Sequence, residues 1–429
     1  MKVLQRESDV SSVKGSLDLF FKPRSVAVVG ASPKPEKLGC IVIENLIKMG
    51  YQGKIYPVNP NYAGIQGLRV YPSVRDISEP IDVGVVLVPA EVVAEVLKEL
   101  AEKGVKHVVI ISGGFSEIEE GVKRQQEIIE ISKNFGMRII GPNTTGIVST
   151  AGRFSTTFVR GEVRPGSVAY VAQTGIFGGL TSSLISSREY FGISKIIGLG
   201  NKIDVDDADA LEYLEKDPET RVIVMYIEAL KDARRFMEVA RKVSEKKPIL
   251  AMKGGKTPAG AKASRSHTSA LATNDTILDA ALKQAGVIRV SNYMDLINYA
   301  KAFAFQQPPR GRRVGAIAPS GGLAVMTADA CQTIGLDLAR FSDETLNNFR
   351  RASPSIIEVG NPYDIWPSIT KLGADAAYKI GMESMMEDDN VDAILAGFGP
   401  AEGFEMKDLS FISAASKRYP EKPIVTYAT

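Results

Sequence analysis

"SVAVVGASPKPEKLG", residues 25–39, carries the pattern that decides the fold. A short β-branched run ends in glycine, a turn rich in small residues and proline follows, and an amphipathic segment of helical length comes next. The same order recurs at "VGVVLVP" (83–89) and "HVVIISGG" (107–114), and "RIIGPN" (138–143) closes the series. Strands this uniformly apolar are expected where helices cover both faces of a sheet. The first part of the chain is therefore predicted to form a parallel, doubly wound α/β sheet.

The strand–helix pattern is repeated twice more along the chain. A second series begins with "SVAYVAQTG" (167–175) and ends with "GVIRV" (286–290). "FQQPPRGRR" (305–313) then indicates a linker, because it combines two prolines, a glycine and three arginines. The third series runs from "RVGAIAPSGG" (313–322) to "KPIVTYAT" (422–429).

These three series predict three α/β domains with parallel sheets of the Rossmann or flavodoxin type. We place them at residues 1–155, 156–304 and 305–429. A length of 429 residues agrees with this number, because single domains usually hold about 100–200 residues. Since the sequence ends on a predicted strand, we expect a trimmed chain or a last domain with little beyond that strand.

Composition and charge exclude several classes of function. The formal net charge is only +2, with 44% hydrophobic and 24% charged residues, so nothing in the total charge favours binding to nucleic acid or to an anionic membrane. The two cysteines, Cys40 and Cys331, have no metal-ligand spacing, and we expect reduced thiols in a cytoplasmic protein and no metal site. The first twenty residues do not resemble a signal peptide, and no apolar run reaches the ~20 residues of a membrane helix.

The strand-end turns of the first domain are the first candidate binding site, because ligands of open α/β sheets bind at the carboxyl ends of the strands. Gly30 allows close backbone approach, Ser32 offers a hydroxyl, and Lys37 offers a positive charge to phosphate. A tight turn with a solvated lysine is the structural alternative, since the GxGxxG pattern is incomplete. The other turns are small and free of acids, as a nucleotide with a pyrophosphate requires, and contain Val58, Asn59, Pro89, Ser112, Gly113 and Asn143.

Asn59 stands near the position where nicotinamide enzymes carry a ribose-binding acid. A nicotinamide-dependent dehydrogenase is therefore disfavoured. Two further motifs also fail. "KGGKTPAG" (253–260) would need glycine at Leu250 to be a P-loop, and "APSGG" (318–322) would need glycine at Ala318 to be a nucleophile elbow.

The second domain carries the more reactive side chains. "QTGIFGG" (173–179) follows a predicted strand and places Gln173, Thr174 and Gly175 at a predicted helix start, where exposed amide groups bind anions. A threonine cap without a ligand is the alternative. Glu228 ends the apolar strand "VIVMYIE", where its carboxylate can accept a hydrogen bond from an imidazole or simply face solvent.

The chain has two histidines, and they differ in their surroundings. His107 begins a strand without polar neighbours and is predicted to be structural or solvated. His267 lies in "SRSHTSALA" (264–272), among small residues and downstream of Lys253, Lys256, Lys262 and Arg265. A neutral imidazole is a competent nucleophile toward phosphorus, and Glu228 is the natural partner for its other ring nitrogen. The alternative to a phosphohistidine is a histidine in a polar loop that takes no part in chemistry.

Several motifs in order along the chain resemble those of NDP-forming acyl-CoA synthetases, which are relatives of succinyl-CoA synthetase. "SRSHTSALA" is similar to their phosphohistidine segment HTGALAG, "GPNTTGI" to GPNxxGI, and "VAQTGIFGG" to the SQSG turn. "YIEA" resembles YIEG, and "GNPYDIWP" resembles GNPxDL. The resemblance extends over essentially the whole chain.

The resemblance implies a CoA-binding Rossmann-like first domain and two flavodoxin-like ligase domains. It implies that His267 carries a phosphoryl group, that Glu228 hydrogen-bonds this histidine, and that Gln173, Thr174 and Gly175 cradle phosphate. CoA would lie on the strand-end turns of the first domain, around Gly30, Ser32, Lys37, Val58, Asn59, Pro89, Ser112, Gly113 and Asn143. The implied reaction converts acyl-CoA, phosphate and ADP to a carboxylic acid, CoA and ATP.

No ATP-grasp module is recognisable in the sequence. The resemblance therefore implies an alpha-type subunit with an ATP-grasp beta partner, in an α2β2 or other heteromer, or the corresponding part of a fusion. Mg²⁺ and ADP or ATP would bind on that partner. Thr174, Ala229, Thr273, Phe177 and Tyr363 depart from the family pattern, which bears on acyl specificity. The rival functions are a CoA-binding regulatory module without turnover, for which His267 would be dispensable, and a citrate-lyase-like enzyme, which would need an added lyase domain.

Overall fold

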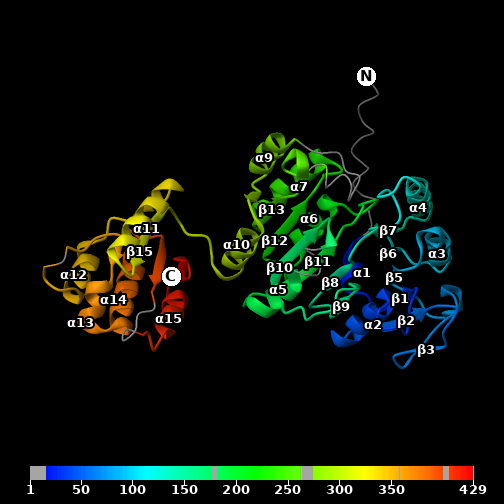
Figure 1. Ribbon diagram of the computed structural model, residues 1–429, viewed down its shortest axis with the longest axis horizontal. Coiled ribbons are helices and arrows are strands. Elements are labelled where there is room, and N and C mark those ends of the chain that lie inside the picture. Colours follow the sequence, from blue (N-terminus) through cyan, green and yellow to red (C-terminus); the bar gives the residue numbers. More distant parts are fainter. Residues whose placement is uncertain are drawn as a thin grey trace, which may run out of the picture. The chain divides into compact units, whose positions relative to one another are not determined.

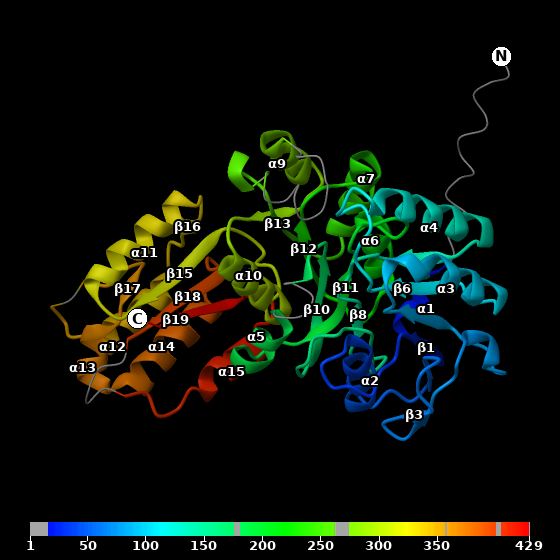
Figure 2. The same cartoon turned by 45° about the vertical axis from the view of Figure 1, so that its right-hand side comes forward.

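The computed structural model describes residues 16–175, 181–260, 262, 274–356, 358–399 and 405–428 (Figures 1 and 2). The chain divides into two compact units, residues 1–304 and 305–429. The first unit contains two α/β sheets and the second unit contains one. The predicted α/β class with mostly parallel sheets is confirmed. None of the helices in these described ranges has the length and apolarity needed to cross a membrane.

The first sheet has five parallel strands in the order β2-β1-β5-β6-β7. Its strands are β1 (Ser25–Val29), β2 (Lys54–Val58), β5 (Val83–Val86), β6 (His107–Ile110) and β7 (Arg138–Ile140). The chain adds β2 on one side of β1 and then returns to add β5, β6 and β7 on the other side, so the strand order reverses between β1 and β5. A crevice at such a reversal is the usual ligand position in a doubly wound sheet.

Helices cover both faces of this sheet, which explains its continuous apolar strands. Val26 and Val28 of β1 pack with α2 (Leu38–Lys48), whereas the alternate residues Ala27 and Val29 pack with α3 (Ala90–Glu102) and α4 (Gly121–Phe135). Helices α3 and α4 lie side by side over their face (Figures 1 and 2). The remaining short elements are α1 (Asp18–Phe21), β3 (Gly64–Ile65), β4 (Leu68–Arg69) and η2 (Val74–Asp76).

The second sheet has the strand order β14-β13-β12-β10-β11-β8-β9. The parallel strands are β10 (Pro165–Ala172), β11 (Ile193–Gly198), β12 (Val222–Ile227), β13 (Ile249–Lys253) and β14 (Ile288–Val290). Two antiparallel strands that the sequence did not predict, β8 (Ile147–Ser149) and β9 (Phe154–Ser155), extend the edge beyond β11. Here the strand order reverses between β10 and β12.

The helices of the second sheet are α5 (Thr181–Arg188), α6 (Asp207–Lys216), α7 (Ala233–Ser244), α9 (Asp275–Gln284) and α10 (Tyr293–Phe305). Leu211 of α6 and Phe236 of α7 are buried in one core, while Ile185 of α5 and Leu296 of α10 are buried in the core on the other face. The core under α6 and α7 continues into the first sheet, because it also contains Val28. One apolar core therefore joins the first two sheets.

The second compact unit has the parallel strand order β16-β15-β18-β19, with β17 also paired to β15. Its strands are β15 (Arg313–Ala318), β16 (Asp337–Leu338), β17 (Tyr363–Asp364), β18 (Ala393–Phe398) and β19 (Ile424–Ala428). Its helices are α11 (Gly321–Thr333), α12 (Asp343–Ala352), α13 (Trp366–Leu372), α14 (Ala374–Glu387) and α15 (Ser410–Arg418).

Candidate active site

The strand-end turns of the first sheet meet at one edge. The registers pair Val29 with both Val58 and Val86, and Val86 with Ile110, so the carboxyl ends of four neighbouring strands are level. The turns that begin at Gly30, at Asn59, after Val86 and after Ile110 therefore lie at one edge, where the strand order reverses between β1 and β5. All predicted CoA residues of these turns lie at this edge.

Gly30 approaches the backbone of the neighbouring strand end closely. Its φ is +94°, and a Cβ atom built there would lie 2.6 Å from the carbonyl oxygen of Leu87. Leu87 N–H donates to Val29 O at 2.9 Å, which holds the two strand ends together. A side chain at position 30 would push these ends apart.

The other predicted CoA residues mainly shape the turns. Ser32 Oγ accepts the N–H of Lys34 at 3.2 Å, and Asn59 Nδ2 donates to Ala31 O at 2.7 Å. Ser112 Oγ donates to Val88 O at 2.6 Å. Val58 is buried at the end of β2, Pro89 precedes α3, and Gly113 faces the side chain of Asn143. Lys37 is exposed at the start of α2.

A cavity of about 340 Å³ joins the carboxyl edges of the first two sheets. Asn143, from the turn after β7, lines it together with Gln173, Thr174 and Gly175 from the turn after β10. One predicted CoA residue thus shares a cavity with all three predicted phosphate residues. Thr144 and Thr145 of the "GPNTTGI" motif also line it. The remaining lining residues, none of them predicted as a site residue, are Leu38, Ile111, Phe158, Gly200 and Asn201.

The turn after β12 is held against the same cavity wall. Glu228 is buried, with 6% of its surface exposed. The next residue, Ala229, donates its N–H to Gln173 Oε1 at 3.2 Å, and Gln173 N–H donates to Tyr226 O at 3.5 Å. Gln173 therefore links the predicted phosphate turn to the predicted catalytic acid by its own amide group.

Lys253, at the end of β13, adds a buried positive charge beside this turn. Its side chain donates to Gly254 O, and burial lowers the pKa of its ammonium group, while the carboxylates of Asp275 and Glu228 act in the opposite direction. Because β12 and β13 are parallel neighbours, Glu228 and Lys253 lie at the same edge. The sequence had offered Lys253 only as one basic residue upstream of His267.

His267 lies outside the described residues, as do all residues from 263 to 273. Residues 176–180 are also outside them, and α5 is described from Thr181 onward. Gly175 is helical, as predicted for a helix start at Thr174 and Gly175. The predicted phosphohistidine stays a prediction. The described residues contain no cluster of three or more His, Cys, Asp or Glu side chains suited to hold a metal ion.

His107 has a structural environment. It is buried at the first residue of β6, where its Nε2 lies 2.9 Å from Ser16 O and its ring meets that of Phe20 edge-on, with centroids 4.9 Å apart. The sequence predicted no polar neighbour for it, and the carbonyl oxygen of Ser16 corrects that point.

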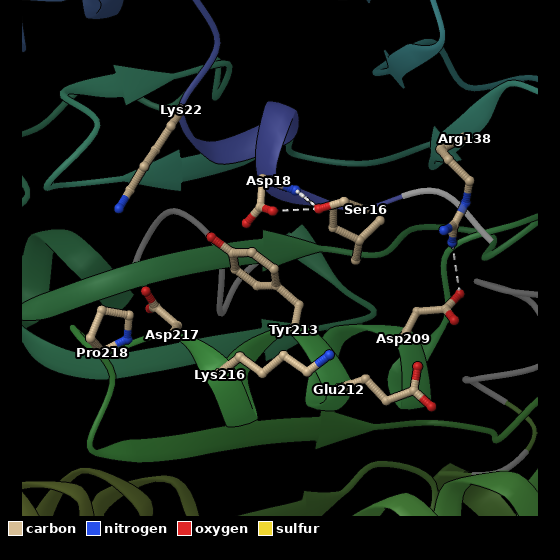
Figure 3. A pocket seen from close by; sticks show the side chains of 11 residues that line it. Ser16, Asp18, Lys22, Arg138, Asp209, Glu212, Tyr213, Lys216, Asp217 and Pro218 are labelled. Carbon is tan, nitrogen blue, oxygen red and sulfur yellow. Dashed lines mark hydrogen bonds and ion pairs between the residues drawn. The ribbon is translucent and has the colours of Figure 1, made fainter. Parts of the chain in front are cut away.

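A second cavity of about 300 Å³ is lined with charged side chains but contains none of the predicted site residues (Figure 3). Arg138 begins β7, at the amino end of the strand, and donates to Asp209 at 3.1 Å. Asp18, Lys22, Tyr213 and Asp217 line the same space (Figure 3). Acids and bases here face one another at the sheet edge opposite the crevice, so we do not place the active site there.

The second compact unit has an apolar cavity of about 700 Å³ at the carboxyl ends of its strands. Trp366, Tyr378 and Phe398 line it, and Tyr378 stacks on Phe398 with ring centroids 4.7 Å apart. Tyr363 is not part of it: its ring is buried and stacks on Phe349, with centroids 4.0 Å apart. Tyr363 therefore fills the core rather than the site.

Comparisons with known proteins identify the family of both sheets of the first unit. A family model described as "CoA binding domain" matches residues 24–150, and one described as "Succinyl-CoA ligase like flavodoxin domain" matches residues 165–303. The chain is 42% identical to "Acetate--CoA ligase [ADP-forming] II subunit alpha" of Pyrococcus furiosus, over 89% of this chain and 82% of that protein. It is 43% identical to "Acetate--CoA ligase [ADP-forming] II" of Archaeoglobus fulgidus, over 88% of this chain but only 56% of that protein.

Among solved structures, an acetyl-coenzyme A synthetase of Candidatus Korarchaeum cryptofilum, in complex with phosphate and ADP, has a TM-score of 0.89 and 32% identity. The match covers 96% of this chain and 89% of that one. Fold and sequence thus agree over nearly the whole chain.

Proposed function

Because the chain belongs to the family of ADP-forming acetate–CoA ligases, we propose that it is the alpha-type part of an acyl-CoA ligase. The proposed reaction converts an acyl-CoA, phosphate and ADP to a carboxylic acid, CoA and ATP. The three α/β domains at 1–155, 156–304 and 305–429 are part of this proposal. The division into compact units at residue 304 and the two family-model matches support them.

The observation that carries the proposal is the cavity between the first two sheets. It brings Asn143, at the CoA-binding edge, together with Thr174 and Gly175, and Gln173 ties their turn to Glu228. A thioester carbonyl entering from the first sheet would meet phosphate held at the second. Positioning two reactants in this way removes much of the entropic barrier to their reaction.

The chemistry proceeds in two displacements. A phosphate oxygen attacks the thioester carbonyl carbon, the carbon–sulfur bond breaks, and CoA leaves as the thiol after taking up a proton. An imidazole nitrogen of His267 then attacks phosphorus, the bond to the acyl oxygen breaks, and the carboxylate leaves. Glu228 accepts a hydrogen bond from the other ring nitrogen and stabilises the positive charge that forms on the ring.

The phosphoryl group passes from His267 to ADP on a partner. We infer an ATP-grasp beta subunit that binds ADP or ATP with Mg²⁺. The naming of two relatives as alpha subunits supports a partner, and the chain spans 56% of the length of the Archaeoglobus fulgidus relative, which is named without a subunit. Stoichiometries such as α2β2 remain part of the proposal.

Phosphoenzyme formation tests the proposal directly. The protein is incubated with acetyl-CoA and radiolabelled phosphate, and we expect an acid-labile protein label that requires both. His267→Ala should abolish the label, and Glu228→Gln should slow its formation while the dissociation constant for CoA is unchanged. Equal labelling of His267→Ala would refute the mechanism and leave the CoA-binding regulatory module as the better description.

A further inference from the structure

A buried ion pair lies directly beside the turn that carries Glu228. Lys202, in the turn after β11, contacts Asp207, the first residue of α6, with Nζ and Oδ2 2.6 Å apart. Their side chains are 5% and 3% exposed. Removing two charges from water costs about as much as their attraction returns, so such a pair adds little to stability over apolar residues of the same size. A role in positioning explains its presence better.

Lys202 uses a second hydrogen bond to hold the Glu228 turn. Its Nζ donates to Ala229 O at 3.0 Å, while Ala229 N–H donates to Gln173 Oε1. The peptide groups on both sides of Ala229 are thus fixed, one from the turn after β10 and the other from the turn after β11. The first of these peptide groups contains the carbonyl of Glu228 and is held by Gln173, and the second is held by Lys202. Together the two bonds restrain the backbone from which the Glu228 side chain projects.

The contact is reciprocal. Lys231, three residues after Glu228, donates from Nζ to Lys202 O at 3.2 Å and to Ile203 O at 2.9 Å. These bonds hold Lys202 in a left-handed backbone conformation, with φ of +54°, that lysine rarely adopts. Each turn therefore holds the backbone of the other through a lysine ammonium group.

We propose that Lys202, with its charge balanced by Asp207, is a positioning residue that sets the orientation of Glu228 toward the phosphorylated histidine. Asp207 fixes the direction of the Lys202 ammonium, and Lys202 fixes the Ala229 peptide. This inference rests on the proposed catalytic role of Glu228. It predicts that the pair affects the rate of phosphoryl transfer and leaves CoA binding unchanged.

The test replaces both charges at once, by Lys202→Met together with Asp207→Leu, so that no unpaired ion stays buried. The rate of labelling from acetyl-CoA and radiolabelled phosphate should fall on the order of tenfold to a hundredfold. The dissociation constant for CoA and the thermal midpoint should match the parent protein. If this variant does not fold, Lys202→Gln with Asp207→Asn is measured in its place, with the same expectation.

A second readout separates positioning from a general structural effect. In the Glu228→Gln background, the same double replacement should cause no further loss of rate, because the residue it positions is already disabled. A matched control replaces the buried Lys195–Asp217 pair of the same sheet, with Nζ–Oδ2 3.0 Å, by Met and Leu, and should leave the rate unchanged.

Each outcome decides between the two proposals. An unchanged rate in a folded Lys202→Met, Asp207→Leu variant, while Glu228→Gln is slow, would overturn the positioning role alone. A loss of rate that adds fully to that of Glu228→Gln, or that the control pair reproduces, would also overturn it. An unchanged rate in Glu228→Gln would instead overturn the proposed function of that acid.

Discussion

Gly30→Ala is the sharpest test of the proposed CoA site, since it adds one methyl group between the carboxyl ends of β1 and β5. The new Cβ would lie 2.6 Å from Leu87 O and 2.9 Å from Leu87 C. Gly104→Ala is the matched control. Gly104 has a similar φ of +82°, but a Cβ there meets no atom within 4 Å, and it lies in the turn between α3 and β6.

The two substitutions share one energetic cost and differ in another. A positive φ at a non-glycine residue lowers the free energy of unfolding by on the order of 1–2 kcal/mol, and this loss applies to both variants. At Gly30 the strand ends must also separate, which weakens the bond from Leu87 N–H to Val29 O and loses about 1 kcal/mol more. We expect Gly30→Ala to lose roughly 2–3 kcal/mol of stability in total.

CoA affinity distinguishes the two variants further. The displaced turns lie under the ligand, so the dissociation constant for CoA, measured by titration calorimetry, should rise at least about tenfold in Gly30→Ala, which corresponds to about 1.4 kcal/mol. Gly104→Ala should bind CoA like the parent protein. Equal dissociation constants in the two variants would refute the placement of CoA at this crevice.

Three further predictions concern the rest of the first unit. Lys195→Met leaves Asp217 buried without its cation and should cost about 3–5 kcal/mol in urea unfolding, most of which Asp217→Leu should restore. Burial lowers the pKa of His107, so near that pKa the unfolded chain binds a proton that the folded chain does not. The thermal midpoint should therefore fall as the pH drops below about 6.5. His107→Gln should reduce this dependence of the midpoint on pH, and the same dependence in both proteins would contradict the explanation. Gly175→Ala places a Cβ 2.8 Å from Thr145 Cγ2 and should slow phosphate labelling, whereas added Thr145→Ser should recover it, and no recovery would exclude this clash as the cause.

Much of the fold was predictable because its signals are local. An apolar run, a glycine turn and a helix are read within twenty residues, and parallel pairing then brings Gly30 and Ser112 to one edge. The strands β8 and β9 were missed because they are short and no helix follows either of them, so they lack the strand–turn–helix order by which the other strands were recognised.

The site residues that could be predicted from the sequence are those whose residue types form a motif. Gln173, Thr174 and Gly175 belong to a recognisable motif, but the cavity that they share with Asn143 depends on how two sheets pack, which no spacing reveals. Lys202 was missed for a different reason. Lys202 donates a hydrogen bond to the backbone carbonyl oxygen of Ala229. Because every residue has such an oxygen, no sequence motif indicates this contact.

The apolar core that passes from Val28 through Ile140 and Val171 to Leu211 has a practical consequence for dissecting this protein. A cut near residue 155 would expose that core on both fragments, and neither half would be expected to fold alone. A cut near residue 304 separates two bodies with their own interiors. Swapping modules between relatives should therefore succeed at the second junction and fail at the first, so that the proposed CoA and phosphate sites are transferred together.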